Sequence, residues 1–216
     1  ASDGSNGTIM VRVYAEDAVG NWGSYCSTFI EVQNNNGACG TPAVGEIAGL
    51  VATESVETVE GVEVQLSGSR SMMYMTNFDG SYGFNSLATG GDYTILPHKD
   101  IEHRNGVSTF DLILIQKHIL GSQFLDSPYK MIAADVNNSK SISTIDLIQL
   151  RKLILNIDQE FSNNTSWRFV DADYRFADPS NPWSTGFPEV HNVNNLDRTV
   201  LANFVAIKIG DVNESA

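Results

Sequence analysis

Basic residues, cysteines and long apolar runs are all scarce in this chain of 216 residues. Lysine and arginine together number 13 against 26 aspartates and glutamates, which gives a formal net charge of −13. A surface of that sign repels nucleic acid and anionic lipid, and it attracts divalent cations wherever carboxylates converge. No apolar run approaches the roughly 18 residues that a membrane-spanning helix requires. We therefore expect neither a nucleic-acid partner nor insertion into a membrane.

The common catalytic motifs are also missing. The sequence contains no nucleophile elbow, no phosphate-binding glycine loop, no zinc-binding helix and no cysteine–histidine pair. The four histidines stand in unlike contexts, so each is expected to be structural or exposed. The sequence therefore predicts a protein that is not an enzyme.

The two cysteines are Cys26 and Cys39. Two are too few for a disulfide scaffold, but they are suited to one disulfide bond in an oxidising compartment. Two buried free thiols are the alternative. With the disulfide, the sequence predicts an extracellular or cell-surface location.

The first 38 residues have the pattern of two β-strands. Apolar residues alternate from Ile9 to Val13, and Phe29–Val32 forms a second β-rich run. The turn at Ala15–Asn21, followed by a strand that carries Cys26, resembles the last two strands of an immunoglobulin-like sandwich from large bacterial adhesins. The resemblance implies that the remaining strands come from elsewhere, and a neighbouring chain is one source.

Residues 39–98 have the pattern of a β-sandwich, with short strands separated by glycine-rich turns. The sharpest turn signal is Asp79-Gly80, which suits a tight hairpin. The predicted strands are Ile47–Thr53, Val62–Ser67, Met72–Asn77, Tyr82–Leu87 and Tyr93–Pro97.

Three segments in this stretch, Gly61–Leu66, Thr76–Phe84 and Gly91–Ile95, resemble the B-type, prealbumin-like repeats of Gram-positive adhesins and the carboxypeptidase regulatory-like domains. Some of these relatives carry a Lys-to-Asn isopeptide bond. The first lysine of this chain is Lys99, which follows the last predicted strand. We therefore expect no such cross-link inside this sandwich.

An internal repeat follows, in which Ser108–Leu120 recurs as Ser143–Leu155. In both copies apolar residues fall at positions i, i+3 and i+7, which predicts two amphipathic helices. Ser108 and Ser143 are suited to be their N-caps. Because a duplicated unit buries its apolar faces against its copy, the two helices are expected to pack together.

The segment before the second helix carries oxygen atoms at the spacing of a calcium loop. Calcium takes six to eight oxygen ligands, and a twelve-residue loop supplies them from positions 1, 3, 5, 7, 9 and 12. Ser143 falls at the water-linked ninth position. Lys140 falls at position 6, where such loops usually have glycine, so the turn there is expected to be strained or reshaped. The other ligand positions are filled by Asp135, Asn137, Ser139, the Ser141 carbonyl and Asp146.

A weaker copy of this loop runs from residue 100 to residue 111. Arg104 occupies its fifth position and has no lone pair to offer. The matching positions are Asp100, Glu102, the Gly106 carbonyl, Ser108 and Asp111. Ca²⁺ is the predicted cofactor of both loops, and capping of the helix N-termini by these carboxylates without any metal is the alternative.

The sequence Asp211-Val212-Asn213 near the C-terminus repeats the Asp-Val-Asn that opens the second loop. We therefore hypothesise that Asp211 and Asn213 fold back to complete the first site, or reach a neighbouring subunit.

The paired loops and helices resemble a dockerin, the calcium-dependent partner of cohesin, in which the twelfth ligand is Asp rather than the Glu of cytosolic EF-hands. The resemblance covers Lys99–Asn156 and implies a cohesin-like partner. The residues that face cohesin in dockerins correspond here to Thr109-Phe110 and Thr144-Ile145.

The segment from Asp158 to Thr199 is rich in Asn, Asp, Pro and aromatic residues and shows little periodicity. Such a segment is expected to be a packed insertion. Its aromatic side chains predict a satellite core rather than a sugar-binding platform, and Asp171, Asp173 and Asp178 suggest a third metal site. Val200–Ile209 reads as a strand.

These patterns predict a mainly β fold with a small α module, in which an immunoglobulin-like or prealbumin-like β-sandwich is joined to a two-helix, dockerin-like unit with EF-hand-type loops. The expected segments are a partial immunoglobulin-like hairpin (1–38), the sandwich (39–98), the calcium repeat (99–157), and an irregular insertion with a C-terminal strand packed on that repeat (158–216).

Two functions fit this organisation. The first is a non-enzymatic, extracellular structural subunit of a bacterial surface fibre, stabilised by calcium and polymerising head to tail by strand complementation between copies. The alternative is a dockerin-type C-terminal anchoring module of a secreted enzyme or adhesin that binds a cohesin-like domain.

Overall fold

The structure is a computed structural model that describes residues 7–13, 19, 26–32 and 44–216. The chain divides into two compact units, Ala1–Val44 and Gly45–Ala216. In the first unit, β1 (Gly7–Val13) and β2 (Cys26–Val32) pair antiparallel along their full lengths, which confirms the two predicted strands. The turn between them, apart from residue 19, and the disulfide predicted between Cys26 and Cys39 lie outside the described residues.

The second unit begins with the five predicted strands, and all five are present. Their apolar residues point alternately into the core, as the period of two requires. In β4, for example, Val64 and Leu66 are buried while their neighbours are not. The strands are β3 (Val44–Ala52), β4 (Glu63–Gly68), β5 (Met72–Met75), β6 (Ser81–Ala88) and β7 (Tyr93–His98).

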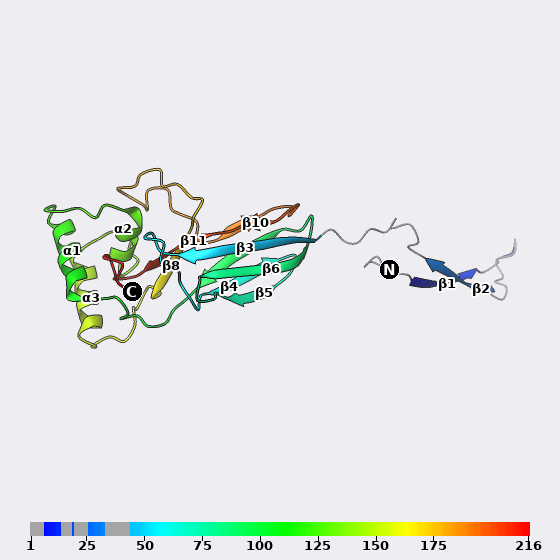
Figure 1. Cartoon of the computed structure of the whole chain (residues 1–216), viewed down its shortest axis with the longest axis horizontal. Coiled ribbons are helices and arrows are strands. Elements are labelled where there is room, and N and C mark those ends of the chain that lie inside the picture. The colour runs from blue at the N-terminus through cyan, green and yellow to red at the C-terminus, as the bar shows by residue number, and fades with distance from the viewer. Residues whose placement is uncertain (1–6, 14–18, 20–25, 33–43) are drawn as a thin grey trace. The chain divides into compact units, whose positions relative to one another are not determined.

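The later part of the chain adds four more strands to the same sandwich. They are β8 (Trp167–Asp171), β9 (His191–Val193), β10 (Val200–Leu201) and β11 (Phe204–Lys208). One sheet has the order β5-β4-β7-β9, and the other has the order β10-β3-β11-β8 with β6 also paired to β3. β11 runs parallel to β3 and antiparallel to β8 (Figure 1).

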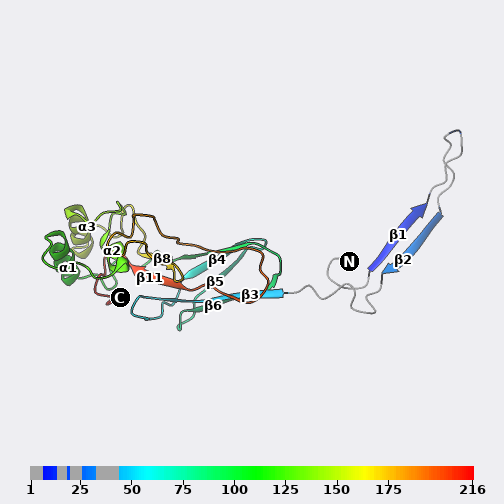
Figure 2. The same ribbon diagram turned by 90° about the horizontal axis from the view of Figure 1, so that it is seen from above.

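This arrangement differs from the predicted segmentation. Residues 158–216 were expected to pack on the helical unit, but Trp167, Phe169 and Phe204 lie in the sandwich core between the sheets. Val170 and Ile207, from the same strands, face the helical core instead. β8 and β11 therefore each contribute side chains to both cores. In this way they join the sandwich to the helices within one unit (Figure 2).

The turn at Asp79-Gly80 is present, with Gly80 at a φ of +71°. The strands it connects, β5 and β6, pair with different neighbours, β4 and β3 respectively. The predicted hairpin is therefore a connection between the two sheets.

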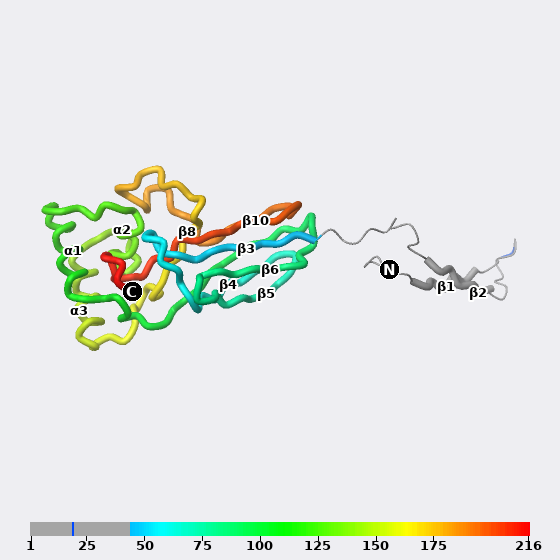
Figure 3. The backbone as a smooth tube through the Cα atoms, in the orientation of Figure 1, coloured from blue at the N-terminus to red at the C-terminus, as the bar shows by residue number. Residues whose placement is uncertain are grey.

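Both predicted helices are confirmed as α1 (Thr109–Ile119) and α3 (Thr144–Ile154), and a short helix α2 (Pro128–Ala134), which the sequence analysis did not predict, lies between them in the chain. α1 and α3 pack against each other. Their buried residues include Ile115, Leu150 and Leu153. The C-terminal segment after β11 runs in among the three helices (Figure 3).

In the described part of the chain, no helix has the length and apolar character needed to cross a bilayer.

Candidate metal centre

The loop between α2 and α3 gathers the predicted oxygen ligands. Asp135 is the C-cap residue of α2, and Asp146 is the third residue of α3. The Asn137 N–H donates to Asp146 Oδ1 at 3.1 Å, and the Ser139 N–H donates to Asp135 Oδ1 at 2.8 Å and to Asn137 Oδ1 at 3.0 Å. The Ser139 hydroxyl donates to the Ser141 carbonyl at 3.2 Å. The five ligand groups are thus linked into one cluster.

Burial makes it costly in free energy to keep the carboxylates of this cluster charged. Asp135 and Asp146 are both fully buried. Desolvation raises the pKa of Asp135, and the nearby charge of Asp146 raises it further. Two buried carboxylates repel each other. A bound divalent cation would offset both this repulsion and the cost of desolvating the charged groups.

The turn inside the loop is reshaped at the position where glycine was expected. Lys140 adopts a φ of +64°, and Asn138 adopts a φ of +55°. The Lys140 N–H donates to Asp135 Oδ2 at 2.8 Å, and Arg168 Nη1 donates to the Asn138 side-chain oxygen at 3.1 Å. These bonds hold two non-glycine residues in the left-handed region, which agrees with the predicted strain.

The second half of the first loop repeats this geometry at the start of α1. The Ser108 N–H and hydroxyl both donate to Asp111 Oδ2 at 2.8 Å, as the same groups of Ser143 do to Asp146 Oδ2 at 2.8 and 3.1 Å. Asp111 is also fully buried. Capping of the helix therefore uses one carboxylate oxygen in each loop and leaves the other oxygen for a further partner.

The C-terminal segment supplies the first half of that loop. The Val212 N–H donates to Asp111 Oδ1 at 2.9 Å, and the Ser215 hydroxyl donates to the Gly106 carbonyl at 2.9 Å. Asp211 Oδ2 accepts from the N–H groups of Ser215 (2.9 Å) and Ala216 (2.8 Å). The Asp135 carboxylate accepts in the same way from residues four and five positions later.

The match between the two loops extends to the backbone. Glu214 has a φ of +57°, as Asn138 has +55° at the equivalent fourth position. Ser215 therefore takes the fifth position, a role that the sequence analysis missed. The signal was present, because the spacing Asp-x-Asn-x-Ser is shared by residues 135–139 and 211–215.

The Asn213 side chain lies at the centre of this second cluster. One terminal atom of its amide lies 2.6 Å from Asp211 Oδ1, 3.1 Å from Asp111 Oδ1 and 3.0 Å from Ser215 Oγ. An amide nitrogen there donates to both carboxylates. An amide oxygen there adds a further potential ligand to the carboxylate oxygens of Asp111 and Asp211. Desolvation, and secondarily the charge of Asp111, raise the pKa of Asp211.

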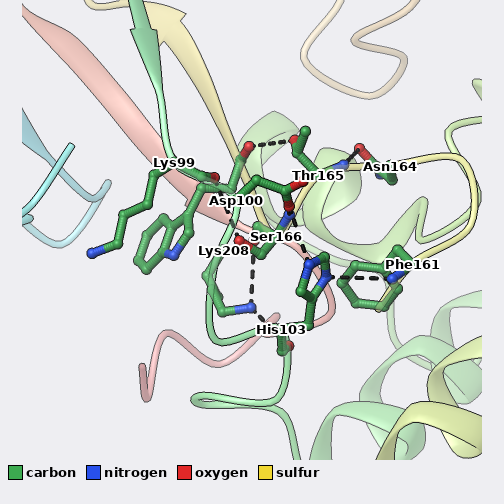
Figure 4. Close-up of polar contacts among 9 residues, drawn as sticks. Lys99, Asp100, His103, Phe161, Asn164, Thr165, Ser166 and Lys208 are labelled. Atoms are coloured by element: carbon green, nitrogen blue, oxygen red, sulfur yellow. Dashed lines mark hydrogen bonds and ion pairs between the residues drawn. The ribbon is translucent and has the colours of Figure 1, made fainter. Parts of the chain in front are cut away.

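Asp100 and Glu102 do not contribute to the cluster in the predicted way. Asp100 Oδ1 accepts from the Ser166 N–H at 2.7 Å and pairs with His103 Nε2 at 3.2 Å (Figure 4). In the described contacts, neither Asp100 nor Glu102 hydrogen-bonds to the Asp111 carboxylate, and Glu102 is exposed at a φ of +54°. The first half of this loop is therefore held against the sandwich, and residues 211–215 of the C-terminal segment occupy the ligand positions that it was expected to fill.

Lys208 is the cationic side chain that helps to hold the segment containing Asp100 and His103 against the sandwich. Its side chain is 5% exposed, and Nζ donates to the carbonyl oxygens of His103 at 2.9 Å and Ser166 at 3.4 Å. Figure 4 shows the ammonium group directed at this segment. Burial lowers the pKa of Lys208 to about 8 despite the attraction of Asp211 and Asp100.

Three of the four histidines have structural partners. His103 Nδ1 accepts from the Phe161 N–H at 3.3 Å, and His118 Nδ1 accepts from the Leu125 N–H at 3.1 Å. Burial lowers the pKa of both rings, which favours the neutral form that accepts these bonds. His191 Nδ1 lies 2.8 Å from Asp171 Oδ2.

The suggested third metal site is only partly assembled. Asp171, Asp173 and His191 lie close together, whereas Asp178 accepts hydrogen bonds from the N–H and hydroxyl of Ser180. The aromatic side chains of this region form the predicted satellite core in part. Those that pack on the helical core are Tyr174, Phe176, Trp183 and Phe187, whereas Trp167 and Phe169 belong to the sandwich core.

No protein-family model and no curated protein matches this chain. Among solved structures, BcpA, the major pilin subunit of Bacillus cereus, aligns at 15% identity over 45% of this chain and 28% of its own, with a TM-score of 0.26. A C-terminal fragment of the pilus adhesin SpaC from Lactobacillus rhamnosus GG aligns at 14% identity over 27% of this chain and 24% of its own, with a TM-score of 0.25.

The Bacillus anthracis TIE protein aligns at 13% identity over 44% of this chain and 18% of its own, with a TM-score of 0.25. This chain thus spans at most 28% of the length of these three structures. Similarity of this size does not establish a shared fold, so the architecture rests on the strand pairing of the chain itself.

Proposed function

We propose that this chain is a non-enzymatic structural subunit of an extracellular bacterial surface fibre, in which two calcium ions stabilise the helical end of the second unit. The observation that carries the calcium part is the doubled ligand set, one built from Asp135–Asp146 and the other from Gly106–Asp111 with the tail.

Calcium is the cation that these groups suit. Each cluster offers carboxylate, carboxamide, hydroxyl and main-chain carbonyl oxygens, and neither includes the nitrogen or sulfur ligands that zinc prefers. The clusters also supply more protein oxygens than magnesium usually takes, because magnesium keeps several of its waters.

Strand complementation would explain the first unit. Among the described residues, β1 and β2 pair only with each other, so each presents an outer edge of backbone N–H and C=O groups. A two-stranded sheet is marginally stable in water, and an added strand pairs such an edge and enlarges the sheet. We propose that a neighbouring copy supplies this strand, which would give head-to-tail polymers.

Metal analysis of the full chain after equilibration with calcium tests the first part. We expect two calcium ions per chain in the unmodified protein and one in Asp135→Ala. The matched control is Asp178→Ala, which removes a carboxylate outside both clusters and should leave two. Fewer than two calcium ions per unmodified chain would contradict the proposal.

Electron microscopy of the full chain with calcium and with chelator tests the second part. Filaments are expected, and Val11→Pro should abolish them because it removes a backbone N–H from the middle of β1, either from the β1–β2 ladder or from the edge that a neighbouring strand would pair. Uniform monomers of the unmodified chain at high concentration would contradict polymerisation.

A specific observation favours the alternative, an anchoring module for a cohesin-like domain. Phe110 and Ile113 on α1 are 52% and 48% exposed, and the equivalent residues of α3, Ile145 and Ile148, are 54% and 55% exposed. Calorimetric titration with a cohesin domain tests this function. Ile145→Asp combined with Phe110→Asp should then abolish binding, and the absence of heat with the unmodified chain would leave the fibre as the better proposal.

A further inference from the structure

We propose that the tail-completed calcium site is a latch that holds β11, the last strand of the sandwich, in its sheet. The inference rests on the proposed binding of calcium and adds a role for one of the two sites. Removing calcium from this site would loosen β11, whereas removing it from the Asp135–Asp146 loop would not.

The path from β11 to the site is short and fixed. β11 ends at Lys208, and Asp211 follows three residues later. In between, the Ile209 N–H donates to the Ser166 carbonyl at 3.0 Å and the Gly210 N–H donates to the Ala133 carbonyl at 2.8 Å. Ile209 is fully buried and Asp211 is 3% exposed. A cation that binds Asp211 is therefore connected to β11 through a short segment whose backbone is held by hydrogen bonds.

The two sites differ in how far apart their ligands lie in the sequence. The hydrogen bonds that close the tail site join residues 101 and 109 positions apart, whereas the bond from Asn137 to Asp146 joins residues 9 positions apart. The tail site therefore loses part of its ligand set when β11 and the segment after it leave the sheet. The contiguous loop keeps its ligands together through the same opening.

The position of β11 connects its release to assembly. It lies between β3 and β8, and it pairs with β3 at Phe204↔Val51 and Val205↔Ala52. Its residues Phe204, Ala206 and Ile207 are 2%, 3% and 4% exposed. Release of β11 would expose both neighbouring strand edges and part of each core, and open edges of this kind accept strands from other chains.

Repulsion supplies the force that opens the latch without calcium. Asp111 and Asp211 are buried, belong to distant parts of the chain and meet at this site. With the cation bound, their charges are neutralised and the tail is held. Without the cation, the buried carboxylate of Asp111 on α1 and that of Asp211, in the segment after β11, repel each other.

Hydrogen exchange of the full chain, measured by mass spectrometry with calcium and with chelator, tests this role. In the unmodified protein we expect calcium to slow exchange of the β11 and β8 amides at least about tenfold. Asp211→Ala and the milder Ser215→Ala should remove most of this effect on β11, and Asp135→Ala should preserve it. Glu214→Gln is the matched control, because it removes one negative charge from the same segment without removing a group of the cluster.

The outcomes separate this inference from the proposed function. If β11 exchange responds to calcium equally in Asp211→Ala, Ser215→Ala and the unmodified chain, the latch is wrong while calcium binding stands. If Asp135→Ala removes the β11 effect as fully as Asp211→Ala does, the latch is also wrong, since the two sites would then act as one. If the unmodified chain binds no calcium, both ideas fail.

Discussion

Asp111, in the first turn of α1, accepts a hydrogen bond at Oδ1 from the main-chain N–H of Val212, 101 residues later in the chain. Its Oδ2 accepts from Ser108 and caps the helix. Asp146 does the same in α3, where Oδ1 accepts from Asn137 and Oδ2 from Ser143. One duplicated carboxylate therefore serves a contiguous loop in one copy and a split loop in the other.

Replacement of Lys140 by glycine should stabilise the protein. Lys140 has a φ of +64°, a region that side chains with a Cβ occupy at a cost and glycine occupies freely. We expect Lys140→Gly to raise the free energy of unfolding by about 1 kcal/mol, measured by urea denaturation in chelator.

The control for this variant is Asn138→Gly in the same turn. Asn138 has a φ of +55°, but asparagine tolerates this region, and its side chain accepts a hydrogen bond from Arg168. No gain is expected there. A loss of stability in Lys140→Gly would show that the lysine backbone is not strained.

A buried and an exposed residue of α3 should respond very differently to truncation. Leu150 is fully buried in the core shared with α1, whereas Ile148, two residues earlier, is 55% exposed. Leu150→Ala should lower the free energy of unfolding by about 2–5 kcal/mol because it leaves a cavity. Ile148→Ala should change it by less than about 0.5 kcal/mol. Similar losses in thermal or urea unfolding would contradict the packing of α3.

The local part of the fold could be predicted from the sequence because its signals are local. Strands β3–β7 alternate with period two, and the helices repeat with capping serines at Ser108 and Ser143. The predicted strand Val200–Ile209 is present as β10 and β11. β9 could not be predicted in this way, because it is three residues long and carries no periodicity of its own. Its position is set by pairing with β7, which lies about 100 residues earlier in the chain.

The candidate site divides along the same line. The contiguous loop was predictable because one twelve-residue window contains all its ligands. In the other loop, the spacing favoured Asp100, yet Ser166 and His103 are its partners in the folded chain. The partner of a side chain depends on which segments meet, and β8 brings Ser166 to Asp100 from 66 residues away. Sequence spacing carries no information about that encounter.

The absence of an internal isopeptide bond remains a prediction, although its original reason was wrong. The reason was that the first lysine of the chain, Lys99, follows the five predicted strands, but the sandwich also includes β11, which contains Lys208. Nζ of Lys208 donates to two main-chain carbonyls, and Nζ of Lys99 donates to the Glu60 carbonyl at 2.7 Å. Both ammonium groups thus face carbonyl oxygens rather than an asparagine carboxamide. Intact mass spectrometry under reducing conditions should give the mass of the sequence, and the loss of one ammonia would contradict this.

Lys208 should make the stability of the protein rise with pH in mildly alkaline solution. Burial lowers its pKa from 10.5 to about 8 in the folded state. Between these two values the unfolded chain holds a proton that the folded chain has released, so the free energy of unfolding increases as pH rises through this window. The full contribution is at most about 3 kcal/mol.

Urea denaturation in chelator at several pH values from 7.5 to 9.5 measures this slope, and Lys208→Met should flatten it while keeping a side chain of similar length. Chelator matters because a cation at Asp211 would lower the pKa of Lys208 further and move the window. Lys117→Met, which removes an exposed lysine on α1, should keep the slope of the unmodified protein. Parallel pH profiles for Lys208→Met and the unmodified chain would mean that the buried ammonium of Lys208 is not the group that titrates. The contacts between Lys208 on β11 and residues 100–105 would then carry no net electrostatic cost.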